Sequence, residues 1–273
     1  MKAAPELITS LQNPRIKQAV RLRERRDRDA TGLFLIEGRR EVARALANGW
    51  TCQTLFFCRD LFAGPPEEET LDRARAAGIE CLACSAAAFA KLAYGDRAEG
   101  LLAVAPQRHR ALADLQLPPN PLLIVAEAIE KPGNLGTILR SADAAGVHGV
   151  IVCDGCTDMH NPNVVRASIG TLFTVPVVEA AGAETLAWLR ARQIAVLAAT
   201  PHTDHEYTAV DLTRGVALVV GQEQTGLSAQ WMAQADLKVK IPMLGQADSL
   251  NVAAATTLLL FEAVRQRRAA GKG

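Results

Sequence analysis

Three polar clusters in the second half of the sequence hold residue types that can bind a sugar or a phosphate. The first contains Asn134 and, six residues later, Arg140; the second contains Glu223; the third contains Ser249 and Asn251. An asparagine at a helix start can present donors to an anion or a sugar, and an arginine can hold a phosphate with two hydrogen bonds. Each cluster lies where a predicted strand gives way to a predicted helix, so the three are candidates for one ligand site.

Each cluster also has an ordinary structural interpretation. Asn134 can cap a helix, Glu223 can lie in a solvated turn, and Ser249 and Asn251 can be the caps of the last helix. Open α/β sheets place their ligands at the C-terminal ends of parallel strands, which favours a functional role for Glu223.

The elements that must position these clusters alternate between apolar runs and helical patterns. Continuous apolar runs predict strands buried on both faces, and hence a mostly parallel sheet covered by helices. These runs are residues 121–126, 149–153, 193–200 and 215–221. Residues 237–241 alternate apolar residues with lysine, which predicts an edge strand. The last helix is expected from about residue 250 to 268.

A change of composition divides the chain. Residues 106–121 contain four prolines and no sustained apolar period, so we predict domains at 1–106 and 122–273 with a linker at 107–121. The first part is expected to be a small α/β module of about 100 residues. Residues 10–30 look helical after Pro14 and are densely charged.

Composition and missing motifs exclude several classes of protein. With 273 residues, 49% hydrophobic and 22% charged, the chain is expected to be globular. No apolar run reaches the roughly 20 residues of a membrane helix, and the N-terminus lacks a secretory pattern, so we expect a cytoplasmic protein with no membrane partner. The sequence has no phosphate-binding loop of the GxxxxGK[ST] type, no GxGxxG and no HExxH.

Two pairs of cysteines have the CxxC spacing of zinc sites, Cys81 with Cys84 and Cys153 with Cys156. Both pairs end apolar runs, where cysteine packs as a small hydrophobic residue, so we predict no metal site. His202 and His205 share a polar loop with two acidic residues, and we expect that loop to be solvated.

The three clusters together resemble one protein family. In chain order they are N134-LGTIL-R140, G221-QEQTGLS and I241-PM followed by S249-L-N251-V, which are similar to the three signature motifs of the SpoU/TrmH family of RNA ribose 2′-O-methyltransferases, within the SPOUT class. The segment around Ser168 and Gly170 is also similar. The first part, with ITSLQNPRIK and FLIEGRREV, resembles the L30e-like RNA-binding module of many members. Gln222, Gln224 and Thr225 depart from the family pattern.

The resemblance implies a SPOUT domain, an α/β fold with a trefoil knot, and a pocket for S-adenosylmethionine (AdoMet) lined by Thr200, Gly221, Ile241 and Leu250. It also implies a homodimer. The last helix, with Ala254, Leu258 and Phe261 besides Leu250, is a candidate interface, and core packing is the alternative.

The resemblance further implies roles for the polar residues. Asn134, Glu223, Ser249 and Asn251 are expected to orient the ribose and the cofactor. Arg140 matches the arginine that is proposed to be catalytic in this family. Because a guanidinium almost never loses its proton, we favour phosphate positioning for Arg140 and leave the proton acceptor open.

RNA is expected to bind partly to the front module, as ribosomal or transfer RNA. Residues 1–44 hold eleven Lys and Arg against six Asp and Glu, and basic residues there can neutralise phosphates. The candidates are Arg15, Lys17, Arg21 and Arg39, and a salt-bridged surface helix is the alternative. Two other functions stay open: a non-catalytic RNA-binding protein that keeps the fold, and a SPOUT enzyme that methylates a small molecule or a base nitrogen.

Overall fold

The computed structural model describes residues 7–94, 98–155 and 157–271 of the chain. These residues form two compact units. Unit 1 comprises Met1–Arg108 and Asp158–Thr174, and unit 2 comprises His109–Thr157 and Val175–Gly273.

Unit 2 is built on a six-stranded sheet with the strand order β10-β8-β9-β5-β6-β7, in which neighbouring strands pair in parallel. The strands are β5 (Leu122–Glu127), β6 (Gly149–Cys153), β7 (Val177–Ala180), β8 (Ala195–Ala199), β9 (Val216–Val220) and β10 (Leu237–Val239). The predicted parallel α/β fold is confirmed, and so is the edge position of the strand that alternates with lysine. A parallel sheet of this kind presents the C-terminal ends of all its strands along one edge.

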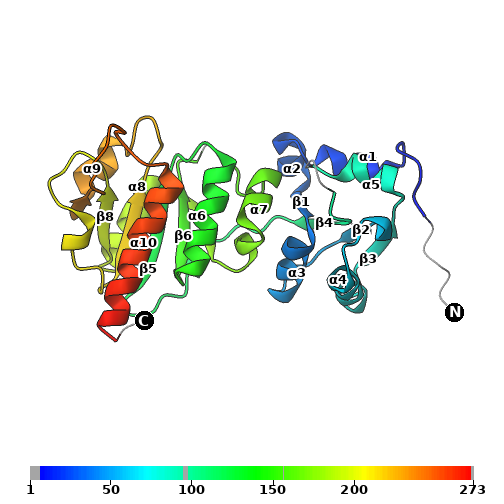
Figure 1. Ribbon diagram of the computed structural model, residues 1–273, viewed down its shortest axis with the longest axis horizontal. Helices are drawn as coiled ribbons and strands as arrows, with labels where there is room; N and C mark the ends of the chain where they lie inside the picture. The colour runs from blue at the N-terminus through cyan, green and yellow to red at the C-terminus, as the bar shows by residue number, and fades with distance from the viewer. Residues whose placement is uncertain (1–6, 95–97, 156, 272–273) are drawn as a thin grey trace. The chain divides into compact units, whose positions relative to one another are not determined.

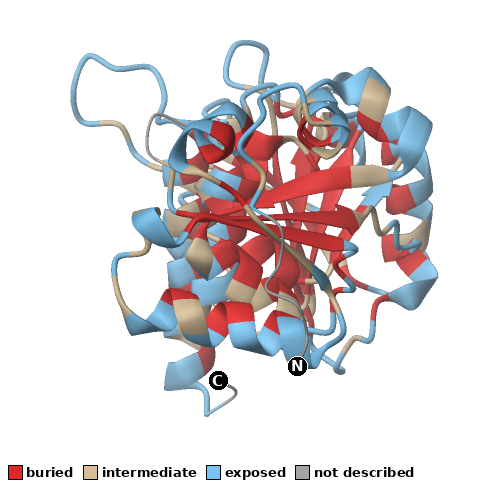
Figure 2. Cartoon of the chain, turned by 90° about the vertical axis from the view of Figure 1, so that its right-hand side faces the viewer, coloured by how far each residue is buried: buried red, intermediate tan, exposed pale blue. Residues whose placement is uncertain are grey.

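Helices cover both faces of this sheet. Helices α6 and α10 lie side by side over one face (Figure 1), joined by a 2.7 Å hydrogen bond between the hydroxyls of Ser141 and Thr257. On the other face, Trp231 and the leucines of α8 pack against Val125 and Val219. The helices are α6 (Pro132–Ala144), α8 (Gly182–Ala191), α9 (Ala229–Gln234) and α10 (Val252–Ala269). The strands are drawn mostly in the colour of buried residues in Figure 2, and every residue of β5, β6 and β9 is buried, as continuous apolar runs require.

A buried arginine fixes the end of α10. Arg267 is 7% exposed, and its guanidinium donates to the carbonyl oxygens of Leu212, Asn120, Pro121 and Arg214 at 2.8 to 3.2 Å. Those carbonyls lie just before β5 and β9, so the last helix is tied to the start of the two central strands. The trefoil knot stays a prediction.

Unit 1 contains a mixed four-stranded sheet with the order β1-β4-β2-β3, in which β2 and β3 are parallel and the other pairs antiparallel. Its strands are β1 (Leu33–Glu37), β2 (Thr54–Phe57), β3 (Glu80–Ala83) and β4 (Leu101–Pro106). Helices α1 (Pro14–Arg21) and α5 (Ala86–Leu92) pack on one face, while α3 (Arg39–Ala47) and α4 (Pro65–Ala76) contact the sheet with their apolar residues. The predicted small N-terminal α/β module is therefore present.

The helical stretch expected over residues 10–30 is two helices, α1 and α2 (Arg25–Thr31). Arg28 explains the break. Its side chain is 1% exposed and donates to the carbonyl oxygens of Leu22 and Arg23, which the interrupted helix leaves without partners. The same guanidinium binds the Asp158 carboxylate at 2.6 and 2.9 Å. A pattern of charges alone could not show that one of the six arginines in residues 10–30 is buried.

Residues 158–174 pack within unit 1, although they lie between two strands of unit 2 in the chain. They form α7 (Pro162–Ser168) and the 3-10 turn η3 (Thr171–Phe173), which the sequence did not predict. Phe173 and His160 join Phe34 and Trp50 in an aromatic cluster with ring centroids 4.7 to 6.4 Å apart. The predicted functional domains, 1–106 and 122–273 with the linker 107–121, stay a prediction.

Two features of the sequence can be placed directly. The described cysteines Cys81, Cys84 and Cys153 are free thiols, and Cys156 lies outside the described residues. Within residues 7–94, 98–155 and 157–271, no cluster of three or more His, Cys, Asp or Glu side chains could hold a metal ion. Over those same ranges, no helix has the length and apolarity that a membrane crossing requires.

Candidate active site

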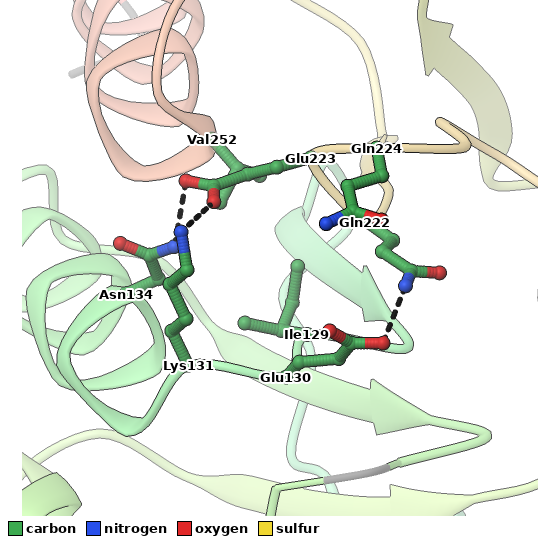
Figure 3. A pocket seen from close by; sticks show the side chains of 8 residues that line it. All are labelled: Ile129, Glu130, Lys131, Asn134, Gln222, Glu223, Gln224 and Val252. Carbon is green, nitrogen blue, oxygen red and sulfur yellow. Dashed lines mark hydrogen bonds and ion pairs between the residues drawn. The ribbon is translucent and has the colours of Figure 1, made fainter.

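A pocket lies where the loops that follow β5 and β9 meet the start of α10. Because β5 and β9 are parallel neighbours, their C-terminal ends bring residues about 90 positions apart in the chain to one place. Figure 3 shows the side chains that line the pocket. They are Ile129, Glu130, Lys131, Asn134, Gln222, Glu223, Gln224 and Val252.

Glu223 is the centre of a polar network in this pocket. Its Oε1 accepts hydrogen bonds from the side-chain amides of Asn134 at 2.9 Å and Asn251 at 2.6 Å. Its Oε2 accepts from the Lys131 ammonium at 2.6 Å (Figure 3). The Asn251 amide also donates to Asn134 Oδ1 at 3.1 Å. One residue from each of the three predicted clusters is thus held in a single network.

Local structure explains how two of these side chains are aimed. Helix α6 begins at Pro132, so Asn134 lies in the first turn and does not cap the helix, contrary to the structural alternative. Proline is favoured at that first position because its φ angle is already helical. Asn251 does cap α10, since its Oδ1 accepts from the backbone amides of Ala253 and Ala254. Its amide nitrogen still donates to Glu223, so capping and participation in the site occur together.

The charge of Glu223 follows from these contacts. The hydrogen bond from Lys131 is the main cause that lowers the pKa of the Glu223 carboxyl, and the Asn134 and Asn251 amides lower it further. The same ion pair raises the pKa of Lys131. Both carboxylate oxygens already accept hydrogen bonds, so the geometry suits Glu223 to orienting its neighbours.

Three of the four predicted cofactor residues lie within two residues of the C-terminal ends of adjacent strands. Thr200 comes after β8 and Gly221 after β9, while Ile241 lies two residues beyond β10. The Thr200 backbone amide donates to Val239 O at 2.9 Å, which joins the ends of β8 and β10. Leu250 is 37% exposed and precedes Asn251 in the chain.

The backbone of the loop after β9 packs closely around Gly221. A Cβ atom at Gly221 would lie 2.5 Å from the carbonyl oxygen and 2.6 Å from the carbonyl carbon of Gly226, so the loop closes on itself only with glycine here. A turn of this kind exposes backbone groups at the end of β9, which fits a pocket that binds AdoMet mainly through backbone atoms. The role of the four residues Thr200, Gly221, Ile241 and Leu250 in AdoMet binding stays a prediction.

The structure leaves Arg140 and Ser249 outside the network. Arg140 lies six residues beyond Asn134 on α6, which places it about 120° around the helix and about 9 Å along its axis. Both side chains are exposed, and neither has a hydrogen-bond or ion-pair partner in the part of the chain that the structure describes. Arg140 is therefore available to a ligand or to another chain.

The four candidate RNA-binding residues of unit 1 differ in their contacts. Arg15 binds Glu80, with Nη1 to Oε1 at 3.1 Å, and Arg39 lies 3.5 Å from Glu67. These two match the salt-bridged alternative. Lys17 and Arg21 are exposed on α1, and their side chains have no partner among the described residues.

The sequence did not predict Lys131 or Glu130 as pocket residues, nor the hydrogen bonds that Gln222 makes there. The Gln222 amide donates to Glu130 at 2.5 Å, and its oxygen accepts from Thr225 at 2.9 Å, which ties the loop after β9 to the loop after β5 (Figure 3). The signal for Lys131 was its place directly before the proline that starts α6. Gln222 and Thr225 were recognised only as departures from a family pattern.

A parallel α/β sheet whose adjacent strand ends and last helix converge on one polar pocket is the arrangement expected from the resemblance to SpoU/TrmH methyltransferases. Comparison with known proteins identifies the family. The sequence model of the SpoU rRNA methylase family matches residues 121–261, and that of the MRM3-like substrate-binding domain matches residues 13–103. The chain belongs to the SpoU rRNA methylase family, which confirms the predicted resemblance.

Three relatives are similar over nearly the whole chain. A 23S rRNA (uridine(2479)-2′-O)-methyltransferase of Streptomyces viridochromogenes is 35% identical over 97% of this chain and 93% of its own length. A crystal structure of an RNA 2′-O ribose methyltransferase is 42% identical, with a TM-score of 0.85, and covers 96% of this chain and 100% of that one. The AdoMet-bound rRNA methyltransferase of Sinorhizobium meliloti is 32% identical, with a TM-score of 0.86 and coverage of 97% and 98%.

Proposed function

We propose that this AdoMet-dependent RNA ribose 2′-O-methyltransferase acts on ribosomal RNA. The network of Asn134, Glu223 and Asn251 is the observation that supports methyl transfer, because it joins one residue of each family motif in a single pocket. Similarity to a 23S rRNA enzyme extends over both units, including the substrate-binding module. This full-length likeness favours ribosomal RNA over transfer RNA.

The chain's own residues hold the sugar for an in-line reaction. When bound, AdoMet would supply an electrophilic methyl group: the carbon–sulfur bond would break as the methyl carbon bonds to the ribose 2′-oxygen, with S-adenosylhomocysteine leaving and the hydroxyl proton passing in the end to water. Glu223 fixes the Asn134 and Asn251 amides, which would orient the ribose, and a fixed geometry provides much of the rate. Arg140 stays protonated, so it would hold the phosphate beside the target ribose. Ser249 would approach from the loop before α10.

The homodimer belongs to this proposal. Leu258 and Phe261 are 42% and 47% exposed on α10, which lies beside the helix that carries Arg140. Burying this face between two copies would remove apolar surface from water and place Arg140 near a second chain. Light scattering should give twice the chain mass of 29.2 kDa, and Phe261→Asp should give a monomer. A wild-type enzyme that is active as a monomer would refute the dimer.

A binding experiment separates catalysis from the non-catalytic alternative. Isothermal titration with AdoMet should show saturable binding, and incubation with labelled AdoMet should transfer the label to unmodified ribosomal RNA but not to transfer RNA. No heat and no transfer would favour an RNA-binding protein that has lost catalysis. Label in transfer RNA alone would contradict the choice of substrate. Since ribosomal RNA is the proposed substrate, we also infer a cytoplasmic location.

A further inference from the structure

Among the described residues that line the pocket, Lys131 is the one cation, and no family motif explains its contact. It lies in the loop after β5, directly before Pro132, and its ammonium crosses to Glu223 in the loop after β9, 92 residues away in the chain. The distance from Nζ to Oε2 is 2.6 Å, and 72% of the Lys131 side chain is exposed (Figure 3).

The network has a definite direction, and Lys131 completes it. The capping bonds to α10 fix Asn251 Oδ1, so its amide nitrogen must be the atom that donates to Glu223 and Asn134. Both asparagine amides then converge on a single carboxylate oxygen, Oε1 of Glu223. Lys131 is the donor to the other oxygen, Oε2, among the contacts of the described residues.

Removing the ammonium would leave Oε2 without a hydrogen-bond donor among the residues that the structure describes. The carboxylate could then turn about its last torsion, which is broad, and present either oxygen to the asparagines. The Asn134 amide would follow, because both its donor and its acceptor atoms are engaged in the network. An exposed ion pair contributes little to folding, so this loss should appear in the reaction and not in stability.

We propose that Lys131 is a positioning residue for methyl transfer, which holds the Glu223 carboxylate in the single orientation that aligns Asn134 and Asn251. This role rests on the proposed function. An ammonium that bound an RNA phosphate instead would act on substrate affinity, and the kinetics distinguish the two roles.

The first experiment compares Lys131→Met with Lys131→Arg and with Lys238→Met, a control on β10 away from the pocket. Lys131→Met should lower kcat by roughly 10- to 100-fold, as small displacements of reacting groups do. The KM for RNA, the AdoMet Kd and the melting temperature should stay near wild type, and the arginine variant should recover most of kcat. An unchanged kcat would overturn the proposal. A raised KM with a flatter salt dependence would overturn it in favour of a phosphate contact.

A double-mutant cycle tests whether Lys131 acts through Glu223. In the Glu223→Gln background the carboxylate is gone, so adding Lys131→Met should reduce kcat by less than about twofold further. Effects that multiply would show an independent role and refute the proposal.

A third measurement does not depend on activity. Carbon-13 NMR titration of the Glu223 carboxyl should give a higher pKa in Lys131→Met and a nearly unchanged pKa in Lys131→Arg, because the ammonium is the main cause that lowers it. An unchanged pKa in Lys131→Met would show that the contact is absent in solution. If no RNA were methylated, the proposed function would fail while this titration still decided the contact.

Discussion

A buried carboxyl group in unit 1 gives a prediction with a calculable magnitude. Glu41 lies in the first turn of α3, 8% exposed, and burial raises the pKa of its carboxyl from 4.5 to about 7. The nearby charge of Glu99 raises this pKa further, while Arg40, Arg44 and the hydrogen bond from the backbone amide of Glu41 lower it. Burial is the largest of these causes, so it outweighs the two arginines.

The sign of the effect on stability follows from the protons bound in each state. Between pH 4.5 and about 7 the folded protein keeps a proton on Glu41 that the unfolded chain releases, so stability falls as the pH rises through this window. Each pKa unit corresponds to about 1.4 kcal/mol, which sets an upper limit of about 3 kcal/mol for the whole window. Above pH 7 the folded state carries a buried charge.

The test is Glu41→Gln, which resembles the protonated side chain and still offers an oxygen to the backbone amide. At pH 8 the variant should be more stable than wild type by up to about 3 kcal/mol, and at pH 5 the two should nearly coincide. The matched control is Glu69→Gln, at an exposed position on α4. Its stability should equal that of wild type at both pH values.

A chain with two compact units need not unfold in a single step, so the assay must report on unit 1. Urea titrations combined with brief proteolysis and mass spectrometry of peptides from β1 and α3 give that resolution. A stability difference that is the same at pH 5 and pH 8, or a glutamine variant that is less stable at pH 8, would refute the reasoning.

Three further predictions concern the elements around the site. Arg28→Met should destabilise unit 1 by about 3–5 kcal/mol in urea titrations, because it leaves the Asp158 carboxylate, whose side chain is only 11% exposed, without its ion-pair partner. Gly221→Ala should weaken AdoMet binding by roughly tenfold or more in calorimetry, since the added Cβ meets the Gly226 backbone. Arg140→Ala should lower methyl transfer by roughly 100-fold with AdoMet affinity retained, because its guanidinium would stabilise charge in the reaction.

Each of these variants has a matched control. Arg25→Met removes an exposed ion pair of α2 and should leave stability nearly unchanged, and an equal loss in Arg25→Met and Arg28→Met would contradict the buried pair. Gly133→Ala adds a Cβ into open space, so it should bind AdoMet like wild type. An Arg140→Ala enzyme that methylates RNA at the normal rate would show that Arg140 is not needed.

Most of the fold could be predicted from the sequence because apolar periodicity reports burial directly. The long runs of β5, β6, β8 and β9 are buried on both faces, and their patterns show it. Strand β7 was not predicted because it has only four residues, and Glu179 within it is exposed. The helix and the 3-10 turn of residues 158–174 were not predicted either, because their apolar residues are buried against elements that are distant in the chain.

The candidate site was predictable only in part. The motifs located Asn134, Glu223 and Asn251, and a parallel sheet accounts for their meeting at one edge. Hydrogen-bond direction could not be foreseen: Asn134 was a plausible cap, and only the start of α6 at Pro132 turns its side chain toward Glu223. Lys131 has no motif of its own, so its contact became visible only once the two loops were placed together.

The position of the transferred methyl group tests the central claim most directly. Wild-type protein is incubated with methyl-labelled AdoMet and unmodified ribosomal RNA, and the labelled nucleotide is mapped by mass spectrometry. The network around Glu223 predicts one nucleotide with the methyl group on its ribose, and the phosphodiester bond on its 3′ side should resist alkaline cleavage because the 2′-hydroxyl is blocked. A methyl group on a base, or no labelled RNA at all, would contradict the account.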